Sequence, residues 1–331
     1  MKPASRSNIF RSLLSLVLLA CAVWIFFNRV SIVDQITVWR YQPSSTVRDI
    51  ASKSSMSGEG RFLFYASRPQ VEAATSFNSH CRQHTEKTAI LGCYVARQIF
   101  IYDITDERLN GIKEVTAAHE MLHAVYDRLS EHERQRINAL IDEAMKTIND
   151  ASLQARLSLY DKTEPGERYN ELHSILGSEA QQLPVELEHH YEQYFTNRLS
   201  LTELFRRYER VFTELEQQQR DLVDQLNTLA ASIDDRSRRY NQEVTSLVED
   251  ISSFNNRSSS GDFASSAQFS RERSALLNRQ QQLSSERQQI EAMIRDYDSK
   301  KQALDSLNLQ AESLQRSIDS TSLPNAPDIA Q

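Results

Sequence analysis

The sequence predicts a mostly helical α+β protein in which a small mixed domain is followed by a long antiparallel helical hairpin. Only seven Gly and seven Pro occur in 331 residues, which favours long uninterrupted helices. One clear β-type segment, Gln98–Ile104, is β-branched and aromatic, whereas apolar residues recur at heptad spacing towards the C-terminus. These patterns divide the chain into an N-terminal cytoplasmic stub with an apolar helix (1–40), a compact domain (41–200), the hairpin (201–320) and a disordered tail (321–331).

The N-terminus predicts a signal anchor. Lys2, Arg6 and Arg11 precede an apolar run from Leu13 to Phe27, and the chain stays fairly apolar up to Val38. Positive charge before the run places the N-terminus in the cytoplasm and the bulk of the chain across the membrane. We therefore expect a periplasmic or extracellular domain, most simply on a bacterial inner membrane.

Two other roles for this segment stay open, namely a cleaved signal peptide and a lipoprotein signal. The residues before Cys21 weakly resemble a bacterial lipobox, but residues 22–27 remain apolar where a lipoprotein normally turns polar. The other two cysteines, Cys81 and Cys93, bracket a short polar stretch. In an oxidising compartment they predict a structural disulfide, which would stabilise the fold by about 2–3 kcal/mol.

The segment before the central motif predicts β-structure. Gln98–Ile104 is expected to form a strand, followed by turn signals at Thr105-Asp106 and Asn110-Gly111. Arg61–Tyr65 is a candidate for a second strand. The strand at 98–104 then runs just ahead of a helix, without Gly or Pro, that contains the most informative residues of the chain.

These residues are His119-Glu120-Met121-Leu122-His123. Residues four apart share one face of a helix, so the two histidines can hold one metal ion together. Glu120 lies near that ion without binding it, and can accept a proton from a water whose pKa the metal has lowered. Because Val115, Ala118, Leu122 and Val125 follow helical spacing, we expect an apolar stripe facing a core, with the histidines directed elsewhere.

A catalytic zinc commonly has three protein ligands, so a third ligand is expected. Pro165 and Glu167 resemble the start of a second helix, which would carry Glu171. Glu179 is a rival for the same role. Glu171 is favoured because of the residues around it, Tyr169-Asn170-Glu171-Leu172-His173-Ser174.

With these two motifs the chain resembles the gluzincin metallopeptidases, the thermolysin-like branch of the zincins. Asn170, Glu171 and Ser174 match the family pattern N-E-x-x-S-D, whereas Ile175 stands at its Asp. The resemblance covers roughly residues 95–180. It implies a zincin-like domain, zinc held by His119, His123 and Glu171, and Glu120 as catalytic base.

The resemblance also implies an edge strand beside the cleft that pairs with an extended peptide. The strand at 98–104 is the candidate for this role, and an ordinary core strand is an equally weighted alternative. Support for His119 has to come from Ser174 or a backbone carbonyl, because the family's Asp is missing. Three downstream histidines, His173, His189 and His190, are expected at the surface or behind the ligands. The oxyanion-stabilising group stays open among Tyr160, Tyr169, His189 and His190.

Beyond the compact domain, apolar residues keep alternating three- and four-residue spacing from Leu222 to Phe254 and a strict seven-residue spacing from Phe269 to Ile318. Asn255–Asp262 is polar and is expected to break the helix between the two runs. Residues 201–254 and 269–318 are therefore predicted to pack antiparallel within one chain. Pairing of each with a second chain in a parallel dimer is the alternative.

The net charge of −7 argues against nucleic acid as a partner. The sequence favours a membrane-anchored zinc endopeptidase that acts on peptides or proteins, with a coiled coil that docks a protein partner or spaces the catalytic domain. The alternative is a non-catalytic coiled-coil envelope scaffold with a degenerate zincin-like domain. Retention of Glu120 beside both histidines favours the enzyme, and Ile175 at the family's Asp favours the scaffold.

Overall fold

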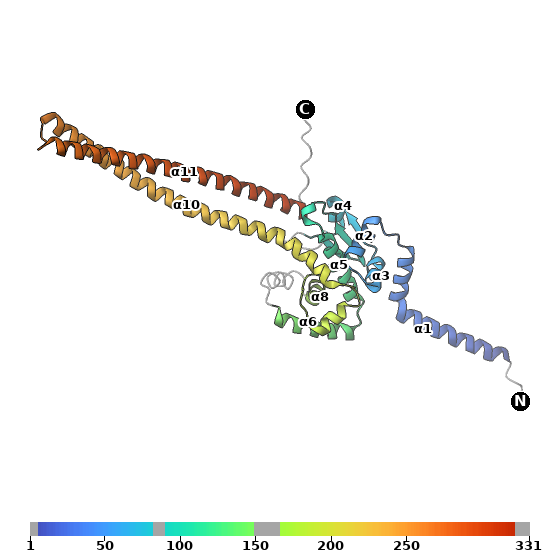
Figure 1. Cartoon of the computed structure of the whole chain (residues 1–331). Coiled ribbons are helices and arrows are strands. Elements are labelled where there is room, and N and C mark those ends of the chain that lie inside the picture. The colour runs from blue at the N-terminus through green and yellow to red at the C-terminus, as the bar shows by residue number, and fades with distance from the viewer. Residues whose placement is uncertain (1–5, 82–89, 149–165, 322–331) are drawn as a thin grey trace, which may run out of the picture. The chain divides into compact units, whose positions relative to one another are not determined.

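The computed structural model describes residues 6–81, 90–148 and 166–321, with side chains from residue 13 onward. It is mostly helical, with one small sheet, as predicted (Figure 1). The chain divides into two compact units, which are described separately. Unit 1 comprises residues 1–211 and 314–331, and unit 2 comprises residues 212–313. The predicted disordered tail, apart from its first residue, lies outside the described residues.

Unit 1 begins with α1 (Arg6–Arg40). Its segment Leu13–Arg40 is long and apolar enough to cross a membrane, and an 18-residue window within it has a mean hydropathy of 2.2. A membrane anchor and a signal sequence both satisfy this criterion. The end of α1 packs against α3, whereas its first part leads away from the rest of the unit (Figure 1).

Two short helices follow, α2 (Ser45–Lys53) and α3 (Gly58–Ala66). The expected strand at Arg61–Tyr65 is wrong, because these residues lie within α3. Ser57 caps this helix by accepting a hydrogen bond from the Gly60 amide at 3.1 Å. A short aromatic and apolar run is compatible with either conformation, and here the serine cap and a buried helical face fix the helix.

The sheet has three strands in the order β1-β3-β2: β1 (Gln70–Glu72), β2 (Gly92–Val95) and β3 (Gln98–Tyr102). β3 is the predicted strand, but it lies at the centre of the sheet, parallel to β1 and antiparallel to β2. The edge position considered for this strand is therefore wrong and the alternative of a core strand is confirmed, whereas β2 forms an edge. A strand buried between two neighbours can be as aromatic and β-branched as one at an edge.

The predicted disulfide joins Cys81, which follows α4 (Ala74–His80), to Cys93 in β2. Both half-cystines are buried against Phe77 and Phe100. The bridge therefore ties the edge of the sheet to the helix packed beside it. Cys21 is exposed and is not in a disulfide.

The centre of unit 1 is α5 (Ile112–Arg128), which packs against α2, α3, α8, β2 and β3. It follows the short 3-10 helix η1 (Glu107–Leu109) and begins after Gly111, whose φ of 104° is favourable only for glycine. This confirms the turn expected there. The remaining helices of the unit are α6 (Glu131–Thr147), α8 (Arg168–Ser178) and α9 (Val185–Tyr191). Pro165, part of the expected start of α8, lies outside the described residues.

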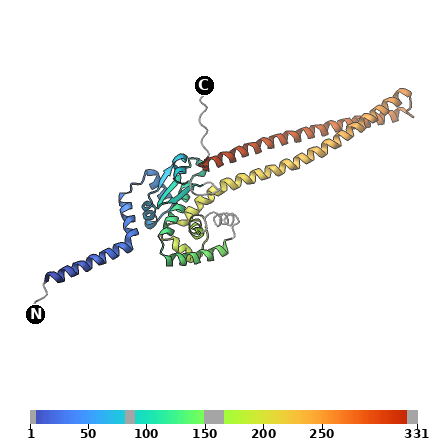
Figure 2. The same ribbon diagram turned by 180° about the vertical axis from the view of Figure 1, so that it is seen from behind.

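Two long helices, α10 (Arg198–Ser260) and α11 (Ser266–Ile318), lie side by side in both views (Figures 1 and 2). Within unit 2, Gln219 donates a hydrogen bond to Asn308 at 2.8 Å, and Arg236 contacts Glu286 at 2.7 Å. In these contacts a higher residue number on α10 faces a lower residue number on α11, so the two helices run in opposite directions.

The expected helix break at Asn255–Asp262 is wrong for most of its length, because α10 continues to Ser260. Ser259 and Ser260 donate hydrogen bonds to backbone carbonyls four residues earlier, so these polar side chains are satisfied within the helix. The chain reverses at Gly261, whose φ is 74°.

Candidate metal centre

α5 presents the two motif histidines to a cavity. The predicted apolar stripe, Val115, Ala118, Leu122 and Val125, is at most 3% exposed. His119 and His123 lie one turn apart, and their ring planes are inclined by 75° with the centroids 4.8 Å apart. The helix is thus held by its apolar face, while both imidazoles lie on its other side and line the cavity.

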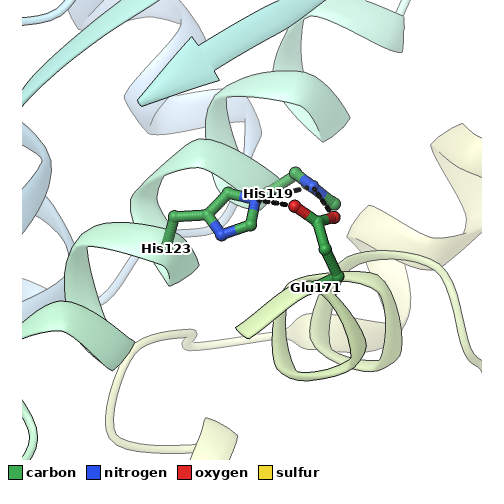
Figure 3. A group of neighbouring side chains, drawn as sticks. All are labelled: His119, His123 and Glu171. Atoms are coloured by element: carbon green, nitrogen blue, oxygen red, sulfur yellow. Dashed lines mark hydrogen bonds and ion pairs between the residues drawn. The ribbon is translucent and has the colours of Figure 1, made fainter. Parts of the chain in front are cut away.

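Glu171 comes from the first turn of α8, which packs against α5. Its carboxylate points at the two imidazoles, so that all three side chains converge from two helices (Figure 3). Glu171 is only 9% exposed. A carboxylate brought out of water in this way needs a positive partner close by.

The distances between the three groups match a metal site. His119 Nε2 and His123 Nε2 are 3.1 Å apart, and Glu171 Oε1 and Oε2 lie 3.5 Å from His123 Nε2 and 3.8 Å from His119 Nε2, respectively. A tetrahedral ion with bonds of about 2.0–2.1 Å places its ligand atoms roughly 3.3 Å apart. Taken one per residue, the three ligand atoms lie within 4.8 Å of one another, so the side chains have to draw closer together to hold one ion.

Asn170 fixes the protonation of His123, a role that the sequence did not reveal. Its Oδ1 lies 2.9 Å from His123 Nδ1, and its Nδ2 donates to Glu167 Oε2 at 2.9 Å, which sets the orientation of the amide. An amide oxygen only accepts, so Nδ1 of His123 carries the proton and Nε2 presents a lone pair towards Glu171. In the sequence, only the position of Asn170 next to the expected ligand Glu171 could have indicated this role.

Glu120 lies one residue round the helix from His119 and is 5% exposed. β2 passes directly over it: a Cβ added at Gly92 would lie 2.5 Å from Thr116 Cγ2 and 2.8 Å from Glu120 Oε1. Glycine is therefore required at position 92 for β2 to approach α5 this closely. The Glu120 carboxylate is confined between the helix and the edge strand.

A cavity of about 1130 Å³ surrounds these groups. Its walls come from β2, α5, α6, α8 and both long helices where they belong to unit 1. The lining includes Gly92, Tyr94, Thr116, His119, Glu120, His123, Tyr126, Glu131, Asn138, Tyr169, Glu171, Glu179, Phe205, Tyr208 and Ile318. It is large enough for several residues of an extended peptide.

The two glutamates considered as third ligand differ in position. His119, His123 and Glu171 bring their ligand atoms within 4.8 Å of one another, whereas Glu179 lines the cavity outside this group. Ser174 does not support His119, because its buried hydroxyl has no hydrogen-bond partner within the described parts of the chain.

The three downstream histidines, His173, His189 and His190, separate into a buried pair and an exposed residue. His173 Nε2 and His190 Nε2 are 2.8 Å apart behind α5. Burial and the neighbouring His190 hold the pKa of His173 well below its usual range, and burial lowers the pKa of His190 to about 4. His189 is exposed and contacts Glu192, as expected for a surface residue.

Of the proposed oxyanion-stabilising groups, Tyr169 is the one that the structure brings to the cavity; Tyr160 lies outside the described residues. The Tyr169 hydroxyl donates to Asp142 at 3.0 Å. The whole donor set, two imidazoles and a carboxylate beside a second buried carboxylate, could hold a divalent transition-metal ion. Comparisons with protein-family models, curated proteins and solved structures find no match for this chain.

Proposed function

We propose that this protein is a membrane-anchored zinc-dependent endopeptidase of the gluzincin type, acting on peptides or proteins in the exported compartment. The observation that carries the proposal is the convergence of His119, His123 and Glu171 beside Glu120 in one cavity. The disulfide and the apolar N-terminal helix are consistent with export.

His119 Nε2, His123 Nε2 and the Glu171 carboxylate would hold the ion. When bound there, zinc would supply Lewis-acid polarisation of the scissile carbonyl and make water a better nucleophile. Asn170 keeps His123 in the tautomer that leaves Nε2 free of a proton. The chain thus contributes one ligand, His123, whose tautomer is set before any ion arrives.

Glu120 is the proposed general base. Its carboxylate takes a proton from the attacking water and delivers it to the amine of the departing peptide, which balances the proton over one hydrolysis. Burial between α5 and β2 limits the positions that the carboxylate can adopt. We propose that the substrate lies along β2, which is at an edge of the described sheet, lines the cavity and can pair with an extended peptide.

The experiment that tests the function uses the full chain in detergent with a mixture of internally quenched peptides. We expect cleavage that stops after chelation and returns on addition of zinc. Retained cleavage after complete metal removal, or no cleavage with one zinc bound per chain, would contradict the proposal.

We expect Gly92→Ala to lower kcat/KM at least tenfold while leaving the zinc content unchanged. The added Cβ has to push β2 from α5 or turn the Glu120 carboxylate, and misplacing a reacting group by about 1 Å can cost roughly 100-fold. Gly58→Ala is the matched control, because a Cβ there meets nothing within 4 Å. Equal activity of the two variants would show that the close approach of β2 is not needed.

For unit 2 we propose that α10 and α11 form an antiparallel coiled-coil hairpin within one chain, which docks a protein partner. Leu226, Leu247 and Ile290 are buried on the long helices, and three phenylalanines pack together at the turn: Phe254, Phe263 and Phe269, with ring centroids 5.0–5.2 Å apart. This packing favours a hairpin closed within one chain, rather than two helices that each pair with a second chain.

We therefore expect a fragment of residues 201–320 to be strongly helical and monomeric at micromolar concentration, because its apolar seam is already covered. Sedimentation equilibrium measures its mass. A dimer mass, with cross-links between identical positions near Leu283, would mean that the helices pair between chains.

The scaffold alternative has one observation in its favour. Ile175, at the family's Asp, is buried and apolar, so it cannot orient His119. A scaffold would hydrolyse no peptide, whether or not it bound metal. The cleavage experiment therefore distinguishes the scaffold from the peptidase.

A further inference from the structure

The last turns of α1 have two faces of different character. Asp34 is 4% exposed, and the helix packs into unit 1 along Asp34, Val38 and Tyr41, whose hydroxyl donates to the Pro69 carbonyl at 2.5 Å. These positions recur every three or four residues and so share one side of the helix. This inner face belongs to the fold of the unit.

The inner face is joined to α5 by a buried ion pair. Arg128 donates from Nε to Asp34 Oδ2 at 2.8 Å and from Nη2 to Asp34 Oδ1 at 3.1 Å, and both side chains are less than a tenth exposed. Arg97 adds a longer contact of 3.4 Å to the same carboxylate. Removing Asp34 would leave the Arg128 guanidinium buried beside a neutral group, which is strongly destabilising.

The same arginine reaches the cavity wall. Arg128 Nη1 donates to the Tyr94 hydroxyl at 3.1 Å, and this hydroxyl lies 3.2 Å from Asp127 Oδ2. Tyr94 belongs to β2, the edge strand that lines the cavity. The end of α1, the end of the motif helix and the edge strand are therefore held together by one set of polar contacts, of which the Asp34–Arg128 pair is buried.

The outer face of the same turns is apolar and open. Val33, Ile36 and Trp39 are 55%, 45% and 82% exposed. At 100° per residue their mean direction is opposite to Asp34. At a tilt of about 25°, which is common for crossing helices, residues 13–39 of α1 rise roughly 37 Å, about one hydrocarbon core plus one headgroup layer. The three side chains then lie at the level where the helix leaves the membrane.

We propose that residues 31–40 dock unit 1 on the bilayer surface. Val33, Ile36 and Trp39 lie in the lipid headgroup boundary, where tryptophan is favoured, while Asp34 on the opposite face locks the helix to Arg128. α1 is then a retained structural element and not a removable signal. His123 is five residues from Arg128, a rise of about 7.5 Å, so the candidate metal centre stays near the membrane. If the proposed peptidase function holds, its substrates are polypeptide segments next to a membrane.

Trp39 is a built-in probe for this contact. The chain has two tryptophans, so Trp24→Phe leaves Trp39 alone. The full-length variant is reconstituted in phosphatidylcholine–phosphatidylglycerol vesicles, with lipids brominated at different depths and with aqueous iodide as quenchers. We expect strong quenching by bromine near the headgroups, weaker quenching near the bilayer centre and little quenching by iodide. Emission of a water-exposed indole, quenched by iodide and by no brominated lipid, would overturn the docking.

A second measurement tests the lock. Asp34→Asn should lower the melting temperature of the full chain in detergent by roughly 10 °C. The double variant Asp34→Asn, Arg128→Met should have the same melting temperature as Arg128→Met alone. Asp49→Asn, at an exposed pair with Lys53, is the control and should shift it little. Equal shifts for Asp34→Asn and Asp49→Asn would overturn the lock, and a mature chain lacking residues 1–40 would overturn the retained helix.

Neither readout depends on zinc or hydrolysis. A docked Trp39 in an inactive protein contradicts the peptidase function alone. A water-exposed Trp39 in an active peptidase contradicts the docking alone.

Discussion

Glu120→Gln is expected to keep the full zinc content and to lose nearly all peptide hydrolysis. The amide has the size of the carboxylate but cannot accept the proton of the attacking water, and Glu120 lies outside the three groups that would hold the ion. General bases contribute about 10²–10⁴-fold, so kcat/KM should fall by at least 100-fold. The measurement is the cleavage rate of one quenched peptide together with the metal content.

Glu131→Gln is the matched control, because it makes the same change at an exposed position lining the same cavity. It should retain activity within a few-fold. If Glu120→Gln and the wild type cleave equally fast, the peptidase interpretation fails and the scaffold gains support.

His119→Ala should abolish stable zinc binding. The substitution removes one of three ligands and leaves only His123 Nε2 and Glu171. Zinc affinity should therefore fall by more than the roughly 10–100-fold that is typical when a group hydrogen-bonded to a ligand is removed. Metal content after dialysis against a weak chelator measures the effect. His189→Ala, at an exposed histidine, is the control and should bind one zinc per chain.

The third ligand is decided in the same assay. Glu171→Gln should lose zinc, and Glu179→Gln should keep it, because Glu179 lies outside the group of converging ligand atoms. Loss of metal in Glu179→Gln alone would mean that the third ligand has been misassigned. Full zinc in His119→Ala would mean that the whole site has been misread.

Much of this arrangement follows from local patterns in the sequence. The spacing of His119 and His123 requires a shared helix face, and the apolar stripe beside them fixes which face is buried. The two apolar runs near the C-terminus predict two long helices that pack together, and the described helices do. Signals of this kind work because helix geometry relates neighbours in sequence directly to neighbours in space.

The errors occur where a local pattern is compatible with two outcomes. Arg61–Tyr65 has strand-like composition, but the Ser57 cap and the burial of one helical side decide for α3. The polar run Asn255–Asp262 contains few helix-breaking residues before Gly261, so α10 continues through most of it. In both cases helix-capping residues and glycine predict the helix boundaries better than polarity or hydrophobicity does.

The contacts that sequence reasoning missed are long-range. Asp34 and Arg128 are 94 residues apart, and Asn170 and His123 are 47 apart. No local spacing relates such pairs. Gly92 is similar, because its requirement comes from Thr116 and Glu120 on another element.

X-ray absorption at the zinc edge, on the purified full chain loaded with one zinc, tests the central claim most directly. The account predicts scattering from two imidazoles at about 2.0–2.1 Å with oxygen completing a four- or five-coordinate shell. Loss of one imidazole contribution is expected in His119→Ala if residual metal is measured. A sulfur-containing shell, a shell of oxygen alone, or an unchanged spectrum in His119→Ala would contradict it.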